Sequence, residues 1–233
     1  SGQLPMTSQV QRETEKFFDH VYKLHLHAFP LNSESDIDVE LDLNADNNTG
    51  ILELHVPLVY GAGAIELSRP VEFSDLFESV VRFHTTPSRN GRDLSIKSSK
   101  FELRVGTAPG VRFEYERDNK GAPTAHIHHS GDAGLLSPAL MKNFFGMKNS
   151  RKKGRIEDIH FPVGGSRFRV SVEEYFSFLF KECGFHACPG WEGALRASRQ
   201  EWLETQLAAA VADNPYVAAA TLRSLGFVVA DPS

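Results

Sequence analysis

The sequence has little cysteine and no long apolar run. Its 233 residues include two cysteines, Cys183 and Cys188, which are too few for a disulfide framework. No segment approaches the roughly 20 apolar residues that a membrane helix needs, and no basic segment followed by an apolar one opens the chain. We therefore expect a cytoplasmic protein with no membrane partner.

The chain also lacks the net positive charge of a general nucleic-acid binder, because its formal net charge is −5. Between Lys142 and Arg169, however, eight basic and two acidic side chains give +6, which leaves −11 for the rest. The densest part of this basic segment is MKNSRKKGR (147–155). It is either a phosphate contact, with Lys152 and Lys153 as ligands, or a solvated charged loop.

The order of the predicted elements places hairpins before helices. Alternating apolar residues predict strands, and apolar residues three or four apart predict helices. The predicted elements are a helix over 8–23, strands over 37–43 and 51–57, a short helix over 74–82, strands near 99–106, 111–117 and 123–129, a helix near 137–145, a strand near 156–161, and helices over 171–183, 190–212 and 215–225.

This order predicts an α+β fold: an antiparallel sheet built from hairpins, an N-terminal helix and a helical C-terminal portion. A chain of this length and 41% hydrophobic residues fits a single domain, which we place at 8–233. Within it, 8–170 is expected to be mainly sheet, and 171–226 to be the helical portion.

Three histidines lie close together in TAHIHHSGD (124–132). In an extended strand His126 and His128 share one face, and His129 takes the other. Histidine has the side-chain pKa nearest to physiological pH, so a pair on one face is a candidate for proton transfer.

The surroundings of this pair depend on the register of a predicted hairpin. If DNKG (118–121) is a tight turn, His126 lies opposite Phe113 on the core face. A bulge or a three-residue loop places the pair beside Arg112 and Glu114 instead, because a slip of one residue inverts the faces. The sequence leaves both registers open.

His126 and His128 are the candidate catalytic residues for phosphodiester cleavage, one as base and one as acid. Arg112 is the candidate for stabilising the charge that builds on phosphorus. The alternative is a sheet edge whose histidines are structural and hydrogen-bonded.

A metal site is a second interpretation of the histidines. His126, His128 and His160 offer imidazoles, and CGFHAC (183–188) adds a C-x2-H-x-C run. Structural zinc sites usually show paired C-x2-C or H-x3-H spacings, which are missing here. We therefore expect no bound metal and no cofactor.

The tripeptides His84-Thr85-Thr86 and His128-His129-Ser130 are similar to the H-x-[ST] elements of two-histidine phosphoesterases. That resemblance implies cleavage of a 2′,3′-cyclic or 2′–5′ phosphodiester. The family requires two lobes that repeat one another, and the segments around these tripeptides do not.

PVGGSRFR (162–169) is a candidate anion site. Its two glycines allow a close approach of the backbone to a ligand, and a predicted helix begins just after it. The candidate ligand-binding residues are His160, Gly164, Gly165, Arg167 and Arg169. Beside His126 and His128 they would form a site the size of a phosphate. The alternative is a tight turn whose arginines pair with acids.

The pattern P-x-x-H-x-H followed by H-F-P-x-G-G-x-R-F-R resembles a family of bacterial proteins for which no activity is established. Eleven residues over roughly 110–225 carry it: Pro123, His126, His128, His160, Pro162, Gly164, Gly165, Arg167, Phe168, Arg169 and Glu174. More loosely, the D-x4-P-x2-H-x-H run (118–128) is similar to TumE-type toxins of toxin–antitoxin modules. This second resemblance implies a role in defence or as a toxin.

These observations predict a protein that binds a phosphate-bearing ligand, RNA or a nucleotide. Cleavage by His126 and His128, as in a phosphodiesterase or a toxin nuclease of phage defence, is the sharper form of the hypothesis. The alternative is a non-catalytic module, antitoxin-like or regulatory, whose C-terminal helices contact a partner protein. Whether the protein is an enzyme is left open by the sequence.

Overall fold

The structure is a computed structural model that describes residues 8–61, 63–65, 70–89, 91–129, 161–163 and 167–230. The predicted helix near 137–145 and the basic segment 147–155 lie outside the described residues.

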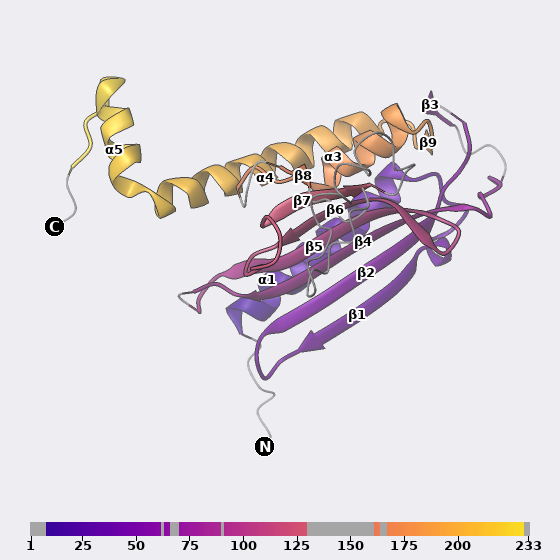
Figure 1. The fold of residues 1–233 in the computed structure, drawn as a ribbon, viewed down its shortest axis with the longest axis horizontal. Coiled ribbons are helices and arrows are strands. Elements are labelled where there is room, and N and C mark those ends of the chain that lie inside the picture. The colour runs from indigo at the N-terminus through magenta and orange to yellow at the C-terminus, as the bar shows by residue number, and fades with distance from the viewer. Residues whose placement is uncertain are drawn as a thin grey trace, which may run out of the picture.

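An antiparallel sheet of seven strands forms the centre of the molecule, in the order β1-β2-β4-β5-β6-β7-β8 (Figure 1). The strands are β1 (Asp38–Asn44), β2 (Thr49–Pro57), β4 (Phe77–Pro87), β5 (Leu94–Val105), β6 (Ala108–Glu116), β7 (Ala125–His129) and β8 (Phe161–Pro162). The helices are α1 (Gln9–Ala28), α3 (Val172–Ser177), α4 (Trp191–Asp213) and α5 (Pro215–Ser224). The α+β fold class is therefore confirmed.

Four short elements complete the described fold. They are the 3₁₀ turn η1 (Glu34–Asp36), the π-helical turn η3 (Phe178–Glu182), and the strands β3 (Gly63–Ala64) and β9 (His186–Ala187). The last two pair in parallel, and η3 continues α3 directly.

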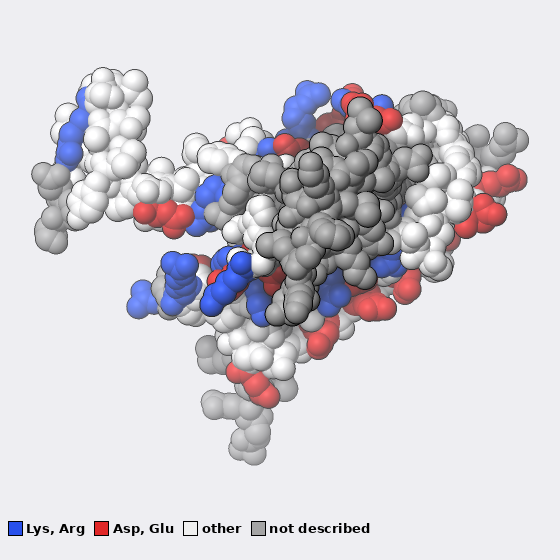
Figure 2. Space-filling view, viewed as in Figure 1, with Lys and Arg blue, Asp and Glu red and all other residues white. Residues whose placement is uncertain are grey.

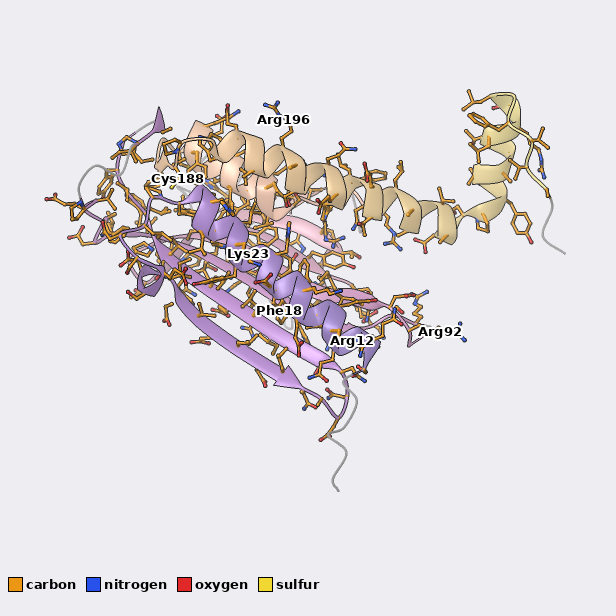
Figure 3. All side chains as sticks on the ribbon, turned by 180° about the vertical axis from the view of Figure 1, so that it is seen from behind. Arg12, Phe18, Lys23, Arg92, Cys188 and Arg196 are labelled. Carbon is orange, nitrogen blue, oxygen red and sulfur yellow. The ribbon has the colours of Figure 1, made fainter. Side chains whose placement is uncertain are left out.

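One face of the sheet is apolar and packs on the helices. Leu54, Val81, Phe101, Phe113 and Ile127 stand opposite one another across five strands. The first three are buried in the same core cluster as residues of α1, α3 and α4. Figure 3 shows α1 lying over this face, roughly along the strands, with α4 beside it. Because side chains alternate along a strand, the residues between these must face the other way.

Polar side chains cap the first turns of α1 and α3. The Ser8 side chain accepts a hydrogen bond from the Gln11 amide and begins α1. Ser171 and Glu174 form a capping box at the start of α3. Such caps satisfy amides that have no partner within the helix.

Tyr175 connects α3 to the middle of the sheet. Its ring is fully buried against Phe101 and Phe113, and its hydroxyl donates a hydrogen bond of 2.6 Å to the carbonyl of Glu102. A buried aromatic side chain contributes roughly 2–3 kcal/mol through burial alone. The contact therefore fixes where the C-terminal helices sit on the sheet.

The predicted helix over 74–82 is wrong. The Ser74 hydroxyl does accept from the amides of Leu76 and Phe77, as a cap would, but Phe77 begins the strand β4. Val80 and Val81 point to opposite faces and are both buried. A central strand buried on both faces shows a continuous apolar run, which periodicity cannot distinguish from a short helix.

The C-terminal helices extend beyond the sheet. The long helix predicted over 190–212 is α4, and the helix predicted from Pro215 is α5. Figure 1 shows α5 turned away from the sheet at the far end of α4. In the described part of the chain, every helix is too short or too polar to cross a membrane.

Candidate metal centre

The register of the β6–β7 hairpin decides the surroundings of the histidines. Glu114 pairs with His126, and Arg112 pairs with His128. Eight residues, 117–124, separate the two strands, so the connection is longer than a tight turn. The second of the two registers allowed by the sequence is the one that forms.

The histidines lie on the polar face of the sheet, opposite the helices. Two rows of paired residues cross this face from β2 to β7. The first row is Glu53, Arg82, Lys100, Glu114 and His126, and the second is His55, Val80, Glu102, Arg112 and His128.

Most charges in these rows are neutralised by close neighbours. Arg82 contacts Glu53 at 3.2 Å, and the buried Glu102 accepts from Arg104 Nε at 2.5 Å. Toward the β1 edge the surface becomes acidic, and Figure 2 shows acidic side chains gathered there. His126 and His128, at the β7 end of the two rows, therefore lie on a face where most side chains are ionisable.

Glu114, His126 and His128 converge on one point. The Oε2 atom of Glu114 lies 3.3 Å from Nε2 of His126 and 3.2 Å from Nε2 of His128. The two imidazole rings are 4.9 Å apart and nearly perpendicular, at 75°. All three ligand atoms lie within 4.8 Å of one another, and no other such group of three is found among the described residues.

The hydrogen bond on the far side of His126 fixes its tautomer. Its Nδ1 lies 2.7 Å from the carbonyl oxygen of Pro123, and a carbonyl only accepts, so Nδ1 carries the proton. In the neutral ring Nε2 then has a lone pair, which faces the carboxylate oxygen of Glu114. Two acceptors at 3.3 Å repel one another unless a cation lies between them, either a proton or a metal ion.

Glu114 is ionised at any physiological pH. Burial by itself would raise its pKa, but the hydrogen bond from His128 and the charges of Arg112, His128 and His126 outweigh burial and lower the pKa to about 2. The group therefore presents a full negative charge to the two imidazoles.

The cluster is closed on one side and accessible on the other. The His126 side chain is 3% exposed, whereas that of Glu114 is 25% exposed. Arg112 lies at this accessible side, with Nη1 3.6 Å from Glu114 Oε1. Its Nε is buried and has no acceptor among the described residues.

The predicted arginines lie elsewhere. Arg169 is buried with its guanidinium 4.1 Å from the centre of the Tyr115 ring, and Tyr115 follows Glu114 in β6, so the two point to opposite faces. Arg167 pairs with Asp213 at 2.6 Å. The structure therefore does not bring Arg167 and Arg169 together with His126 and His128. His160, Gly164, Gly165, Lys152 and Lys153 lie outside the described residues.

The other two histidine patterns do not assemble a site in the described chain. Cys188 donates its thiol to the carbonyl of Phe29, and burial raises its pKa. The ligand atoms of Cys183, His186 and Cys188 do not form a group that could hold one metal ion. His84 lies on β4. Three strand spacings, about 14 Å in total, separate β4 from β7, which carries His128.

Glu114 is the site residue that the sequence did not single out. It stands between Phe113 and Tyr115, so alternation alone places it on the polar face. Its role follows only when the register sets it opposite His126.

Comparison with family models, curated proteins and solved structures gave no match. The resemblance to a bacterial family and the looser one to TumE-type toxins therefore stay predictions, and the function has to be inferred from the site itself.

Proposed function

We propose that Glu114, His126 and His128 bind one divalent transition-metal ion, Zn²⁺ in the first instance, and that this centre binds and hydrolyses a phosphate-bearing ligand. The observation that carries the proposal is the orientation of His126, whose proton is held by the Pro123 carbonyl while its lone pair faces Glu114. This departs from the expectation of no bound metal.

The separations within the cluster suit a metal ion. A tetrahedral zinc ion lies about 2.0–2.1 Å from nitrogen and oxygen ligands, which places neighbouring ligand atoms about 3.3 Å apart. The two distances to Glu114 Oε2 are 3.3 Å and 3.2 Å. The third separation, between ligand nitrogens of the two imidazoles, is at most 4.8 Å, so the two rings have to move closer together where it exceeds the tetrahedral value.

The hydrogen bond to Pro123 is the contact that a metal-bound histidine makes. Metal-bound histidines usually donate their second N–H to a carbonyl or carboxylate, which fixes the tautomer and orients the ring. Two imidazoles and one carboxylate form the ligand set of hydrolytic zinc enzymes, and a similar set also holds Fe²⁺. Three protein ligands leave a position for water, and zinc lowers the pKa of that water to roughly 7.

Arg112 supports a phosphate-bearing ligand. It lies at the accessible side of the cluster, and its Nε has no acceptor among the described residues. A guanidinium binds phosphate oxygens through two parallel hydrogen bonds. The proposed division of roles is therefore a metal-bound water as nucleophile and Arg112 as the group that stabilises charge on phosphorus.

The zinc-loaded protein is expected to hydrolyse bis(p-nitrophenyl) phosphate, and Arg112→Gln is expected to lower kcat/KM by about tenfold or more while the metal content stays the same. Arg82→Gln is the matched control, because Arg82 lies on the same face but pairs with Glu53. The release of p-nitrophenol gives the rate. Turnover that survives removal of the metal by a chelator would contradict the proposal.

A second candidate function is protein binding through the C-terminal helices, favoured by their exposed apolar side chains. On α4 and α5 they are Leu203, Leu207, Val211, Tyr216, Val217 and Leu222, and just after α5 the exposed Leu225, Phe227 and Val228 continue the surface. An apolar surface of this extent is unusual on a protein that works alone. We take a second copy of the chain as the occupant, because a two-fold contact lets one apolar surface bury itself.

In sedimentation velocity the protein is expected to form a dimer, which the double substitution Leu207→Lys with Val211→Lys converts to a monomer. Lysine at these positions places charge inside the contact, which costs several kcal/mol when it is unpaired. Gln200→Lys, on an exposed part of the same helix, is the control and should leave the dimer intact. A wild-type chain that stays monomeric at about 100 µM would exclude this contact.

A further inference from the structure

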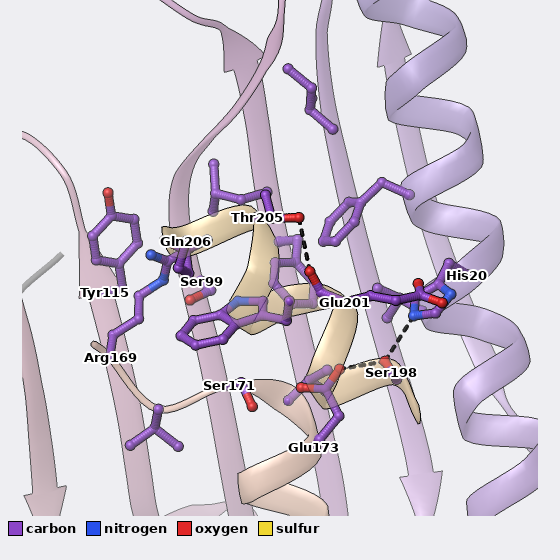
Figure 4. Close-up of a pocket in the computed structure, with 18 of the residues that line it drawn as sticks. His20, Ser99, Tyr115, Arg169, Ser171, Glu173, Ser198, Glu201, Thr205 and Gln206 are labelled. Carbon is purple, nitrogen blue, oxygen red and sulfur yellow. Dashed lines mark hydrogen bonds between the residues drawn. The ribbon is translucent and has the colours of Figure 1, made fainter. Parts of the chain in front are cut away.

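A cavity of about 480 Å³ lies on the opposite side of the sheet from the metal centre, between the apolar face and the helices α1 and α4 (Figure 4). Small-molecule pockets usually enclose about 300–1,000 Å³. We propose that this cavity binds a small organic amine with an apolar body, held by the carboxylate of Glu173. The proposal is independent of the proposed metal centre.

Two residues that line the cavity each carry a buried acceptor atom without a partner in the described chain. These atoms are Oε2 of Glu173 and Oε1 of Gln206, and the two residues are 4% and 9% exposed. Leaving a buried acceptor without a hydrogen bond costs about 1–3 kcal/mol, and more for a charged group. A ligand with N–H groups would remove this cost.

The other oxygen of Glu173 is already occupied. Its Oε1 accepts the hydroxyl proton of Ser198, and Ser198 Oγ lies 2.9 Å from Nε2 of His20. Ser198 has one proton and gives it to Glu173, so His20 must be the donor to Ser198. Figure 4 shows these three residues in line from α1 through α4 to Glu173. The chain of hydrogen bonds holds the carboxylate in place and leaves Oε2 for a ligand.

The charge of Glu173 selects a cationic donor. Among the described residues Glu173 forms no ion pair. A hydrogen bond between two charged groups is roughly twice as strong as one between neutral groups. Of the basic side chains at the cavity, Lys16 is exposed on α1, Arg167 is neutralised by Asp213, and Arg169 lies against Tyr115, away from Glu173 in Figure 4.

The walls of the cavity suit an apolar body. Phe17, Phe83, Phe101 and Trp202 line it together with aliphatic side chains of the sheet. The cavity is also much larger than the roughly 30 Å³ that one water molecule takes up. An aryl amine combines the ammonium group that Glu173 requires with a ring that packs against these walls.

Three probes of matched shape test the proposal: phenethylamine, phenethyl alcohol and hydrocinnamate. Isothermal titration calorimetry on the intact chain is expected to show saturable binding of the amine, at least about tenfold tighter than the alcohol, and no binding of the carboxylate. Equal affinity for the amine and the alcohol would overturn the proposal. So would the absence of saturable binding of any probe up to about 10 mM.

Glu173→Gln keeps the shape of the side chain and removes its charge, so the affinity for phenethylamine is expected to fall about tenfold or more, to that of the alcohol. Glu204→Gln is the control, because Glu204 is an exposed carboxylate of α4 that contacts Gln200 and does not line the cavity. Amine binding that Glu173→Gln leaves unchanged would overturn the proposal. If the variant fails to fold, the comparison of the three probes on the wild-type chain still decides.

Discussion

Replacing His126 with alanine is expected to lower the affinity for Zn²⁺ by roughly 100-fold or more. The substitution removes the one ligand whose tautomer is already set by the Pro123 carbonyl, and it leaves Glu114 and His128 as an incomplete pair. His128→Ala and Glu114→Gln are expected to have effects of the same order, because each removes one of three ligands.

The measurement is a competition titration against a chromophoric chelator, together with the metal content by mass spectrometry. Wild-type protein is expected to hold about one zinc ion per chain. His129→Ala is the matched control, because His129 is the next residue, lies on the opposite face and is exposed. At a zinc concentration 100 times Kd the wild-type fold should gain about 2.7 kcal/mol, a gain that the three variants lack.

A wild-type chain that binds no metal ion would contradict the proposed metal site. If the wild-type chain holds no Zn²⁺, Fe²⁺ or Mn²⁺ after incubation with each, then the cation between His126 and Glu114 is a proton. The cluster would then be an imidazolium–carboxylate pair, and the metal proposal would be wrong.

Acidification from about pH 6.5 to about pH 4 is expected to lower the free energy of unfolding by about 3 kcal/mol through His25 alone. His25 is fully buried in α1, against Phe29 and Phe176. Burial lowers its pKa from 6.5 to about 4, against the opposing effect of its hydrogen bond to the Val21 carbonyl.

The sign follows from the two protonation states. Below pH 6.5 the unfolded chain binds a proton at His25 that the folded chain does not, so stability falls as the pH falls and the loss is complete near pH 4. Above pH 6.5 His25 is neutral in both states and contributes no pH dependence. Glu114, whose folded pKa is about 2 against a usual value of 4.5, adds a further loss only below about pH 4.5.

Urea unfolding across this pH range measures the effect. His25→Phe keeps the aromatic contacts and removes the titrating group. The loss of stability between pH 6.5 and pH 4 should therefore be smaller by about 3 kcal/mol in this variant. His27→Phe is the control, since His27 is exposed on the same helix and should leave the slope unchanged. Equal slopes for the wild-type protein and His25→Phe would contradict the assignment.

Elements with strong local signals are determined by the sequence alone. Ser8 and the Ser171–Glu174 box set helix starts through hydrogen bonds to residues three positions away, and α4 forms where apolar residues recur at helical spacing. The alternation around Leu52 and Leu54 likewise predicts β2 and the apolar face of the hairpin. These features need no knowledge of distant parts of the chain.

Features that depend on pairing between strands were decided only by the tertiary structure. Residues 77–83 form a strand because β2 and β5 flank them and supply hydrogen bonds, which outweighs the helical spacing of their apolar residues. The end of α1 at Ala28 likewise depends on packing, since Leu24 and Ala28 are buried in the core.

The candidate site also combines one feature set by the local sequence with others set by strand pairing. The sequence by itself determined that His126 and His128 share a face, because alternation along a strand is a local property. Only the pairing of β6 with β7 decided that this face holds Glu114, and that Arg169 lies on the other one. The reason is that a shift of one residue in the hairpin exchanges the two faces. The length of the connecting loop, together with packing of Phe113 against the core, sets that shift.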